Sequence, residues 1–221
     1  TVQSLATGLR RFGKGYFGKG ADGKERKPRI LLVDLDPQVS LSFLFGWDQV
    51  NSDNKPTTYD ALINQTPLPV YKMQEGIYLA PASQKMVSID PFLNQMAVPR
   101  KALRKLLLKP LQEMQGTELA DEGVNSILDA FDYVLIDCPP AMSLLTYNAL
   151  AAASSVVIPV QLEVLATKGI AEITNAVIET REDLNEDLDI RGLLEVMSND
   201  QTKATRQFKE NKNKKFDDYV F

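Results

Sequence analysis

The sequence of 221 residues contains no histidine, and this absence narrows its possible chemistry more than any other feature. Catalytic triads with a histidine base, histidine metal sites and histidine acid–base catalysis are excluded. The single cysteine, Cys138, cannot form an intramolecular disulfide, which suits a reducing compartment. No apolar run approaches the roughly 18 residues that a membrane helix needs. Carboxylates, lysines, hydroxyls and backbone amides remain as the groups available for chemistry.

The charged residues are unevenly distributed along a chain whose net charge is −4. Residues 10–29 contain eight basic and two acidic side chains, and residues 201–221 contain six basic and three acidic ones. Basic segments on an acidic protein can bind anions, but they are also commonly just solvent-exposed surface. Both interpretations stay open for these two segments.

Apolar and amphipathic segments alternate along the chain. The patterns predict strands at 30–36, 76–80, 133–137, 154–161 and 190–197, and helices at 1–12, 58–64, 98–114, 143–153 and 168–184. Strands that are apolar on both faces and alternate with helices indicate an α/β fold, a three-layer sandwich with a mostly parallel central sheet and helices on both faces. We expect a single domain over residues 1–221.

Two of the predicted strands end in aspartate. Asp34 and Asp36 close the strand at 30–36, and Asp137 closes the strand at 133–137. Ligands of such folds bind at the carboxyl ends of the strands. An apolar strand that ends in aspartate is the Walker B arrangement, in which the carboxylate reaches a phosphate-bound Mg²⁺. Taken alone the pattern is weak, and Asp137 could equally serve as a helix N-cap or a turn residue.

Four segments occur in order and at characteristic spacing: VDLDPQ, TTYDALIN, YVLIDCPPAMSLLTYNAL and VVIPVQLEVLATKGI. With these segments the sequence closely resembles the ParA family of deviant Walker ATPases. The resemblance covers nearly the whole chain apart from residues 13–28. It implies a P-loop NTPase-like fold, ATP and Mg²⁺ as cofactors, and hydrolysis of ATP.

The resemblance assigns roles to individual residues. Asp36 corresponds to the catalytic carboxylate of the first switch region, which orients the attacking water. Asp137 corresponds to the Walker B aspartate, which holds Mg²⁺ through water. Asp34 is interpreted as structural because strand alternation sends its side chain elsewhere. Cys138 is interpreted as a packing residue and not a nucleophile, because no basic partner is evident nearby. The resemblance places the nucleotide beside Thr1, Pro139, Pro140, Met197 and Asn199.

The segment GKGYFGKG at 13–20 differs from a Walker A loop at one position, since Gly20 stands where the pattern requires Ser or Thr. A working loop follows a strand and opens a helix, whereas this segment follows a predicted helix and precedes a strand. We therefore interpret 13–28 as an enlarged basic loop. The family's own loop, of the form KGGxGKTT, is expected upstream of Thr1, and the sequence is expected to be cut at both ends. We expect the chain alone to bind ATP poorly or not at all.

The resemblance also implies partners. ATP would close a homodimer that binds non-specific DNA in the cytoplasm, on the nucleoid, and a ParB-like protein would stimulate hydrolysis. A plasmid, a chromosome or a protein cargo would thereby be segregated or positioned, with no membrane involved. Lys168 is either a lysine that acts across the dimer or surface charge. The DNA surface would consist of Lys203, Arg206, Lys209, Lys212, Lys214 and Lys215.

Two related interpretations stay open. A regulatory or structural ParA-like module would have lost hydrolysis, although the retention of both Asp36 and Asp137 argues against this. A MinD-like membrane-positioning ATPase is disfavoured by DLDPQ, but the expected absence of the C-terminus, where its membrane anchor would lie, leaves it open. Nitrogenase iron protein and arsenite-pump relatives need paired cysteines and are excluded because Cys138 stands alone.

Overall fold

The computed structural model describes residues 2–12, 27–47, 55–109, 126–160 and 166–196. It divides into two compact units, residues 1–149 and 150–221, which we describe one at a time. A single domain over 1–221 stays a prediction. Several predicted features lie outside the described residues: the GKGYFGKG segment, Thr1, Met197, Asn199 and the basic residues of 203–215.

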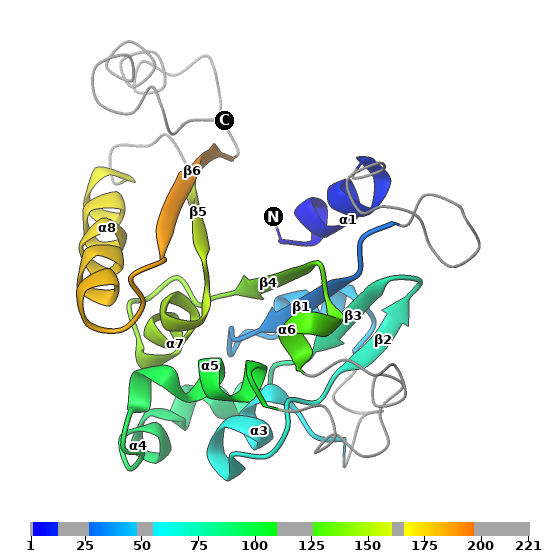
Figure 1. Ribbon diagram of the computed structural model, residues 1–221, viewed down its shortest axis with the longest axis horizontal. Coiled ribbons are helices and arrows are strands. Elements are labelled where there is room, and N and C mark those ends of the chain that lie inside the picture. The colour runs from blue at the N-terminus through cyan, green and yellow to red at the C-terminus, as the bar shows by residue number, and fades with distance from the viewer. Residues whose placement is uncertain (1, 13–26, 48–54, 110–125, 161–165, 197–221) are drawn as a thin grey trace. The chain divides into compact units, whose positions relative to one another are not determined.

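The first unit contains a four-stranded sheet in the order β2-β3-β1-β4 (Figure 1). β1 (Ile30–Asp34) pairs in parallel with β3 (Ile77–Ala80) on one side and with β4 (Tyr133–Asp137) on the other. These three strands confirm the predicted ones, although β1 ends two residues earlier than expected. β2 (Tyr71–Gln74) runs antiparallel to β3 at the edge. It is not among the predicted strands because its four residues, YKMQ, are too few and too polar to stand out.

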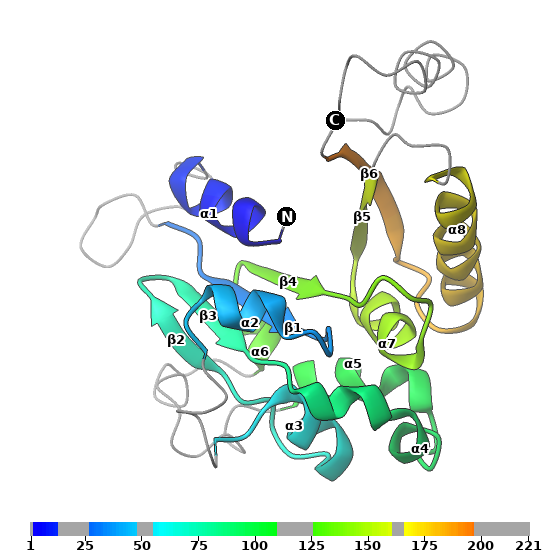
Figure 2. The same cartoon turned by 180° about the vertical axis from the view of Figure 1, so that it is seen from behind.

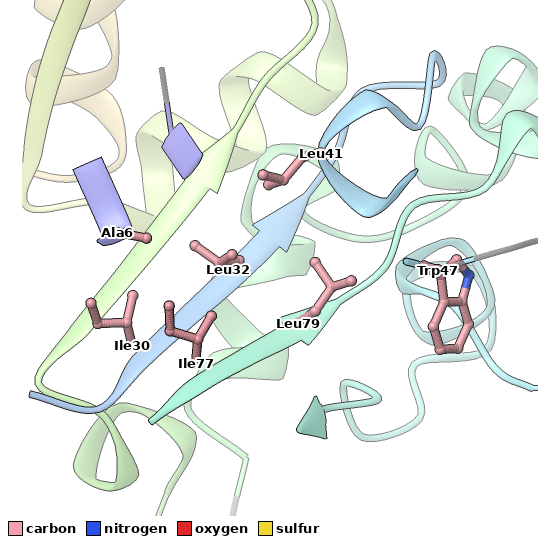
Figure 3. Close-up of a cluster of buried hydrophobic side chains, with 7 residues drawn as sticks. All are labelled: Ala6, Ile30, Leu32, Leu41, Trp47, Ile77 and Leu79. Atoms are coloured by element: carbon pink, nitrogen blue, oxygen red, sulfur yellow. The ribbon is translucent and has the colours of Figure 1, made fainter. Parts of the chain in front are cut away.

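The register of the parallel strands aligns apolar side chains in rows across one face of the sheet. Ile30 lies opposite both Ile77 and Tyr133, and the next row on this face begins at Leu32. Helices α1 (Val2–Phe12) and α2 (Ser40–Leu44) contribute to the same core. Figure 3 shows the buried members of this cluster: Ala6, Ile30, Leu32, Leu41, Trp47, Ile77 and Leu79.

Helices cover both faces of this sheet. α3 (Thr58–Asn64) and α5 (Ala102–Leu107) lie on the opposite side of the sheet from α1, as both views show (Figures 1 and 2). α3 begins with a capping box, in which Thr57 and Asp60 bond each other's backbone amides. The arrangement is the predicted one of a mostly parallel sheet between two layers of helices.

Some helices differ from the predicted ones. The helix predicted at 98–114 starts as a 3-10 turn, η2 (Pro99–Lys101), and continues as α5 only to Leu107, while residues 110–114 lie outside the described part. α7 (Leu144–Ala152) matches its prediction. The unpredicted helices are all too short to produce a periodic pattern: α2, η1 (Gln84–Ser88), α4 (Asp90–Leu93) and α6 (Ile127–Ala130).

Two arginines of the basic segment 10–29 serve the packing of the first unit. The Arg10 guanidinium donates to the Pro28 carbonyl at 2.8 Å and lies 3.8 Å from the Glu75 carboxylate. It also lies against Gly76, whose φ of +72° favours glycine and where a Cβ would overlap the guanidinium. Arg29 lies 5.3 Å above the Tyr78 ring at the amino end of the sheet. These arginines are therefore not simply solvated charges.

The second unit contains two parallel strands and a long helix. β5 (Ser155–Val160) pairs with β6 (Asp189–Glu195), and α8 (Ala166–Asp183) connects them in sequence. Asn185, buried after α8, donates to the Leu150 and Ala153 carbonyls at 3.0 and 2.6 Å. All three elements match the predicted ones. The core of this unit consists of Ile158, Val160, Ile170 and Leu193.

Candidate functional site

Three aspartates meet at the carboxyl edge of the sheet in the first unit. The last aligned pair of β1 and β4 is Asp34 and Asp137, and the Leu35 amide donates to the Asp137 carbonyl at 2.9 Å. Asp36 is the second residue after the end of β1. Parallel strands end at the same edge, so the predicted catalytic and metal-binding carboxylates are brought to one place.

Asp34 is completely buried and its carboxylate is fully engaged inside the protein. One oxygen, Oδ1, accepts from the Asp36 amide at 3.1 Å. The other, Oδ2, accepts from the Ser42 amide at 2.8 Å and from the Ser42 hydroxyl at 2.7 Å. Burial raises the pKa of Asp34, and the bonds from Ser42 oppose that rise. This is the environment of a structural carboxylate.

Asp36 is half-buried and lies in a tight turn between β1 and α2. Its Oδ1 accepts from the Gln38 amide at 2.9 Å, and its carbonyl accepts from the Val39 amide at 2.9 Å. Val39 is in the left-handed region with a φ of 61°, which is unfavourable for a β-branched residue. Backbone amides of this turn therefore bind the Asp36 carboxylate and carbonyl, and the Asp36 amide is bound in turn by the Asp34 side chain.

Asp137 is half-buried at the end of β4, and no hydrogen bond from the described residues reaches its carboxylate. Burial first, and then the neighbouring carboxylates of Asp34 and Asp36, together raise its pKa to about 6. A half-buried carboxylate with negative neighbours and no internal donor is well suited to receive a cation. Oxygen ligands of this kind fit Mg²⁺. Within the described residues no group of three or more potential metal ligands is arranged around one point.

The segment that follows Asp137 leads from β4 toward α7. Burial and then the charge of Asp137 raise the pKa of the Cys138 thiol to about 12. The thiol therefore stays protonated near neutral pH and is a poor nucleophile, consistent with its interpretation as structural. Pro139 is half-buried and Pro140 is exposed, both directly beyond the carboxyl end of β4. Lys168 belongs to the first turn of α8 in the second unit, and its side chain is outside the described part.

Sequence reasoning missed two residues of the aspartate edge, Ser42 and Val39. Ser42 lies eight positions after Asp34 in a helix of five residues, and only the fold reveals their contact. Asn148 was also missed: its side chain accepts from the Leu103 amide at 3.0 Å and donates to the Pro99 carbonyl at 2.9 Å, which ties α7 to the start of α5. A polar residue within the apolar run NALAAA was the only available signal.

A phosphate-binding loop of the Walker type is not found among the described strands and helices, where no strand leads through a glycine-rich loop into a helix. The GKGYFGKG segment lies between α1 and β1, the reverse of the order that such a loop requires. In the same described residues, every helix is too short or too polar to cross a membrane.

Comparison with known proteins places these features in a family. Residues 23–190 match the model of an AAA domain. The sporulation initiation inhibitor protein Soj of Bacillus subtilis is 33% identical over 196 residues, which cover 87% of this chain and 70% of Soj. The chromosome partitioning protein ParA of Myxococcus xanthus is 33% identical over 193 residues, covering 87% of this chain and 62% of ParA. The chain spans 59% of the length of an uncharacterized Pseudomonas putida relative.

Solved structures show the same fold. Cobyrinic acid a,c-diamide synthase from Mycobacterium smegmatis is 27% identical, with a TM-score of 0.72 over 97% of this chain and 75% of that protein. A second structure of that enzyme contains an ATP analog and magnesium and is similar with a TM-score of 0.68 over 86% of this chain and 71% of that protein, at 28% identity. The α/β fold with a mostly parallel sheet is thus that of P-loop NTPases. From the matched domain and these relatives, the chain belongs to the ParA/Soj-like family of partition ATPases.

Proposed function

We propose that the protein containing this chain is a Mg²⁺-dependent ATP hydrolase in which Asp36 and Asp137 act from neighbouring strand ends. The observation that carries the proposal is the alignment of Asp34 with Asp137, because it brings the Asp36 turn and the Asp137 carboxylate to the same edge. The two side chains differ in the way that their roles require. Asp36 is fixed by a turn, and Asp137 has no internal donor among the described residues.

Each carboxylate has a distinct task. Bound Mg²⁺ would neutralise the charge that develops on the phosphate oxygens during transfer. Asp137 would hold the ion through water, and its ionised form would be favoured by the cation it binds. Asp36 would accept a hydrogen bond from the attacking water and orient it, which is a positioning role without covalent chemistry. Pro139 and Pro140, and residues Thr1, Met197 and Asn199, would line the nucleotide.

Hydrolysis of ATP by the purified full-length protein tests this proposal. We expect turnover that is lost when Mg²⁺ is chelated, and that is lost in Asp36→Ala while ATP binding remains. Asp187→Ala, which removes an exposed carboxylate of the second unit, is the control and should keep normal turnover. ATP binding without hydrolysis in the unmodified protein would instead identify a regulatory module, and would contradict the proposal.

We further infer that ATP closes a homodimer that binds DNA without sequence preference and that a ParB-like protein stimulates hydrolysis. The relatives support this inference, since they include proteins named for chromosome partitioning. Lys168 is proposed as a lysine that acts across the dimer, and a cytoplasmic location on the nucleoid would follow from DNA binding. The cargo could be a plasmid, a chromosome or a protein assembly.

DNA binding can be tested separately from hydrolysis. Phosphate contacts release counterions, so affinity for random duplex DNA in the presence of ATP should fall steeply with salt. Replacing the basic residues by alanine should reduce both the affinity and its dependence on salt, whereas Lys85→Ala with Lys105→Ala, at two exposed lysines of the first unit, should leave both unchanged. Affinity that does not respond to salt would contradict the inference. The residues to replace are Lys203, Arg206, Lys209, Lys212, Lys214 and Lys215.

A further inference from the structure

The side chain of Ser42 connects three segments of the first unit at the edge where the aspartates meet. Its hydroxyl donates to Asp34 Oδ2 at 2.7 Å and accepts from the Ala82 amide at 3.0 Å. Asp34 ends β1, Ser42 lies in α2, and Ala82 follows the end of β3. Asp34, Ser42 and Ala82 are all fully buried, so no solvent can take over these bonds.

The same carboxylate holds the turn that carries Asp36 from both sides. Asp34 Oδ1 accepts from the Asp36 amide at the beginning of the turn, and Oδ2 accepts from the Ser42 amide beyond its end. Two donors on one buried oxygen and a third on the other leave the position of the turn little freedom. A charged acceptor makes each of these bonds stronger than a neutral one.

The turn itself is strained and needs such support. Val39 adopts φ 61° and ψ 20°, and its side chain is buried at 6% exposure. Its carbonyl accepts from the Phe43 amide at 2.9 Å, which begins α2 directly after the turn. A left-handed β-branched residue persists only where its surroundings leave it no alternative, and such strain concentrates at functional sites.

We propose that Asp34 and Ser42 form a clamp that fixes the strained turn 36–39 and thereby sets the position of the Asp36 carboxylate. Both are positioning residues, because both are fully buried and their contacts reach the site through the turn that carries Asp36. The role in hydrolysis rests on the proposed function. The mechanical part, that the clamp holds the turn, does not depend on it.

The fluorescence of Trp47 can report on the clamp in the nucleotide-free protein. It is the only tryptophan of the chain, and its amide donates to the Ser42 carbonyl at 3.0 Å. Its ring is 6% exposed and lies 4.6 Å from the Tyr71 ring. A displacement of Ser42 should change the packing of this ring and therefore its fluorescence emission.

Ser42→Ala and Ser42→Thr in the full-length protein form the critical pair of variants, because alanine removes the bridging hydroxyl and threonine keeps it. We expect Ser42→Ala to lower kcat by about tenfold to a hundredfold, the cost of misplacing a positioned group. The KM for ATP should change by less than about threefold, since a positioning loss affects the chemical step rather than binding. Ser42→Thr should recover most of kcat. Trp47 emission and hydrogen exchange of the amides of 36–39 should change in Ser42→Ala without nucleotide.

Thr58→Val is the matched control. Thr58 is also fully buried in the first unit, but its hydroxyl has no hydrogen-bond partner within the described residues. Removing this hydroxyl should leave kcat, Trp47 emission and exchange at 36–39 unchanged. Asp34→Asn is a second test. Its side-chain NH₂ group would face a donor of Asp36 or Ser42 where a carboxylate oxygen now accepts. This variant should reproduce the effects of Ser42→Ala.

Failure of the clamp and failure of the proposed function give different results. If the unmodified protein does not hydrolyse ATP, the proposed function is wrong. The clamp is then tested only by Trp47 emission and by hydrogen exchange of the amides of 36–39. Unchanged emission and exchange in Ser42→Ala would overturn the clamp. Altered emission and exchange with a normal kcat, or an equal loss of kcat in Ser42→Ala and Ser42→Thr, would overturn its role in positioning Asp36.

Discussion

Asp34 and Asp137 are aligned across two neighbouring parallel strands, yet their surroundings are opposite. Asp34 is completely buried and accepts three hydrogen bonds. Asp137 is half-buried, accepts none from the described residues, and has a pKa raised to about 6. Both follow four apolar residues, in ILLVD and YVLID. Two aspartates at equivalent strand ends therefore differ in their internal hydrogen bonds, and the position at a strand end does not determine this difference.

The contrast between Asp34 and Asp137 is tested most directly by neutralising a carboxylate and measuring turnover. Asp137→Asn keeps the shape of the side chain but removes the charge proposed to hold Mg²⁺. We expect kcat for ATP in the full-length protein to fall by about 10²–10³-fold, the usual loss when one preorganised electrostatic group is removed. Asp187→Asn, at an exposed carboxylate, is the control and should be normal. Turnover within a few-fold of the unmodified protein would rule out Asp137 as the metal-binding residue.

The fold and the site were predictable from the sequence to different degrees. The strands β1, β3 and β4 were identified because their apolar runs satisfy a requirement of buried parallel strands that is local in the sequence. The contrast between Asp34 and Asp137 was only partly visible. Strand alternation suggested that Asp34 points away from the nucleotide, but the donors that engage it come from Ser42, which no local pattern connects to it.

The short helices and strands were also not predictable from local sequence patterns. α2 has five residues and β2 has four, and neither length is enough for a helical or strand period to appear. The left-handed Val39 contradicts local preference, because valine avoids this conformation, so only the assembled unit could reveal it. Where long-range contacts determine a local feature, the sequence pattern carries no signal of it.

The free energy of unfolding should respond to the two substitutions in the opposite order from turnover. The larger loss of stability should occur in Asp34→Asn. Asp34→Asn would place an amide donor against the Asp36 amide or against Ser42, leaving a buried donor without an acceptor. We expect a loss of about 2 kcal/mol in the free energy of unfolding. Asp137→Asn removes a desolvated charge and should leave the stability unchanged or slightly increased. Urea denaturation of both variants without nucleotide or Mg²⁺ measures the difference, and a larger loss for Asp137→Asn would reverse our assignment.

The raised pKa of Asp137 predicts how stability depends on pH. The unfolded carboxyl releases its proton near 3.8 and the folded one near 6, so deprotonation favours the unfolded state. The stability that Asp137 contributes is complete below pH 3.8 and is lost as pH rises through 6. With allowance for screening at a half-buried site, we expect the loss to be about 1–2 kcal/mol.

The comparison needed is between the unmodified protein and Asp137→Asn in Mg²⁺-free buffer from pH 4 to 7. Other carboxylates titrate in both proteins, and the difference between the two curves isolates Asp137. The unmodified protein should lose stability relative to the variant as pH rises, and added Mg²⁺ should reduce that loss. A difference that does not change with pH would contradict the raised pKa.

The segments that follow the two aspartates also differ, and this contrast gives the smallest predicted effect. The turn after Asp34 contains the left-handed Val39, whereas no residue of 138–143 after Asp137 has a positive φ. Val39→Ala and Val39→Gly lose similar buried area, but alanine keeps the unfavourable conformation and glycine adopts it freely. We expect Val39→Gly to be more stable than Val39→Ala by about 0.5–1 kcal/mol, against the usual preference for alanine over glycine.

Val70 provides the matched control for the expected greater stability of glycine over alanine at position 39. It is also nearly buried, at 9% exposure, and its φ is not positive. Glycine at position 70 should therefore be less stable than alanine, because only the greater freedom of the unfolded chain distinguishes them.

If the clamp of Asp34 and Ser42 sustains the strain, relief of the strain should also weaken the need for the clamp. The destabilisation caused by Ser42→Ala should then be smaller in Val39→Gly than in the unmodified protein, and purely additive losses would mean that the turn and the clamp are independent.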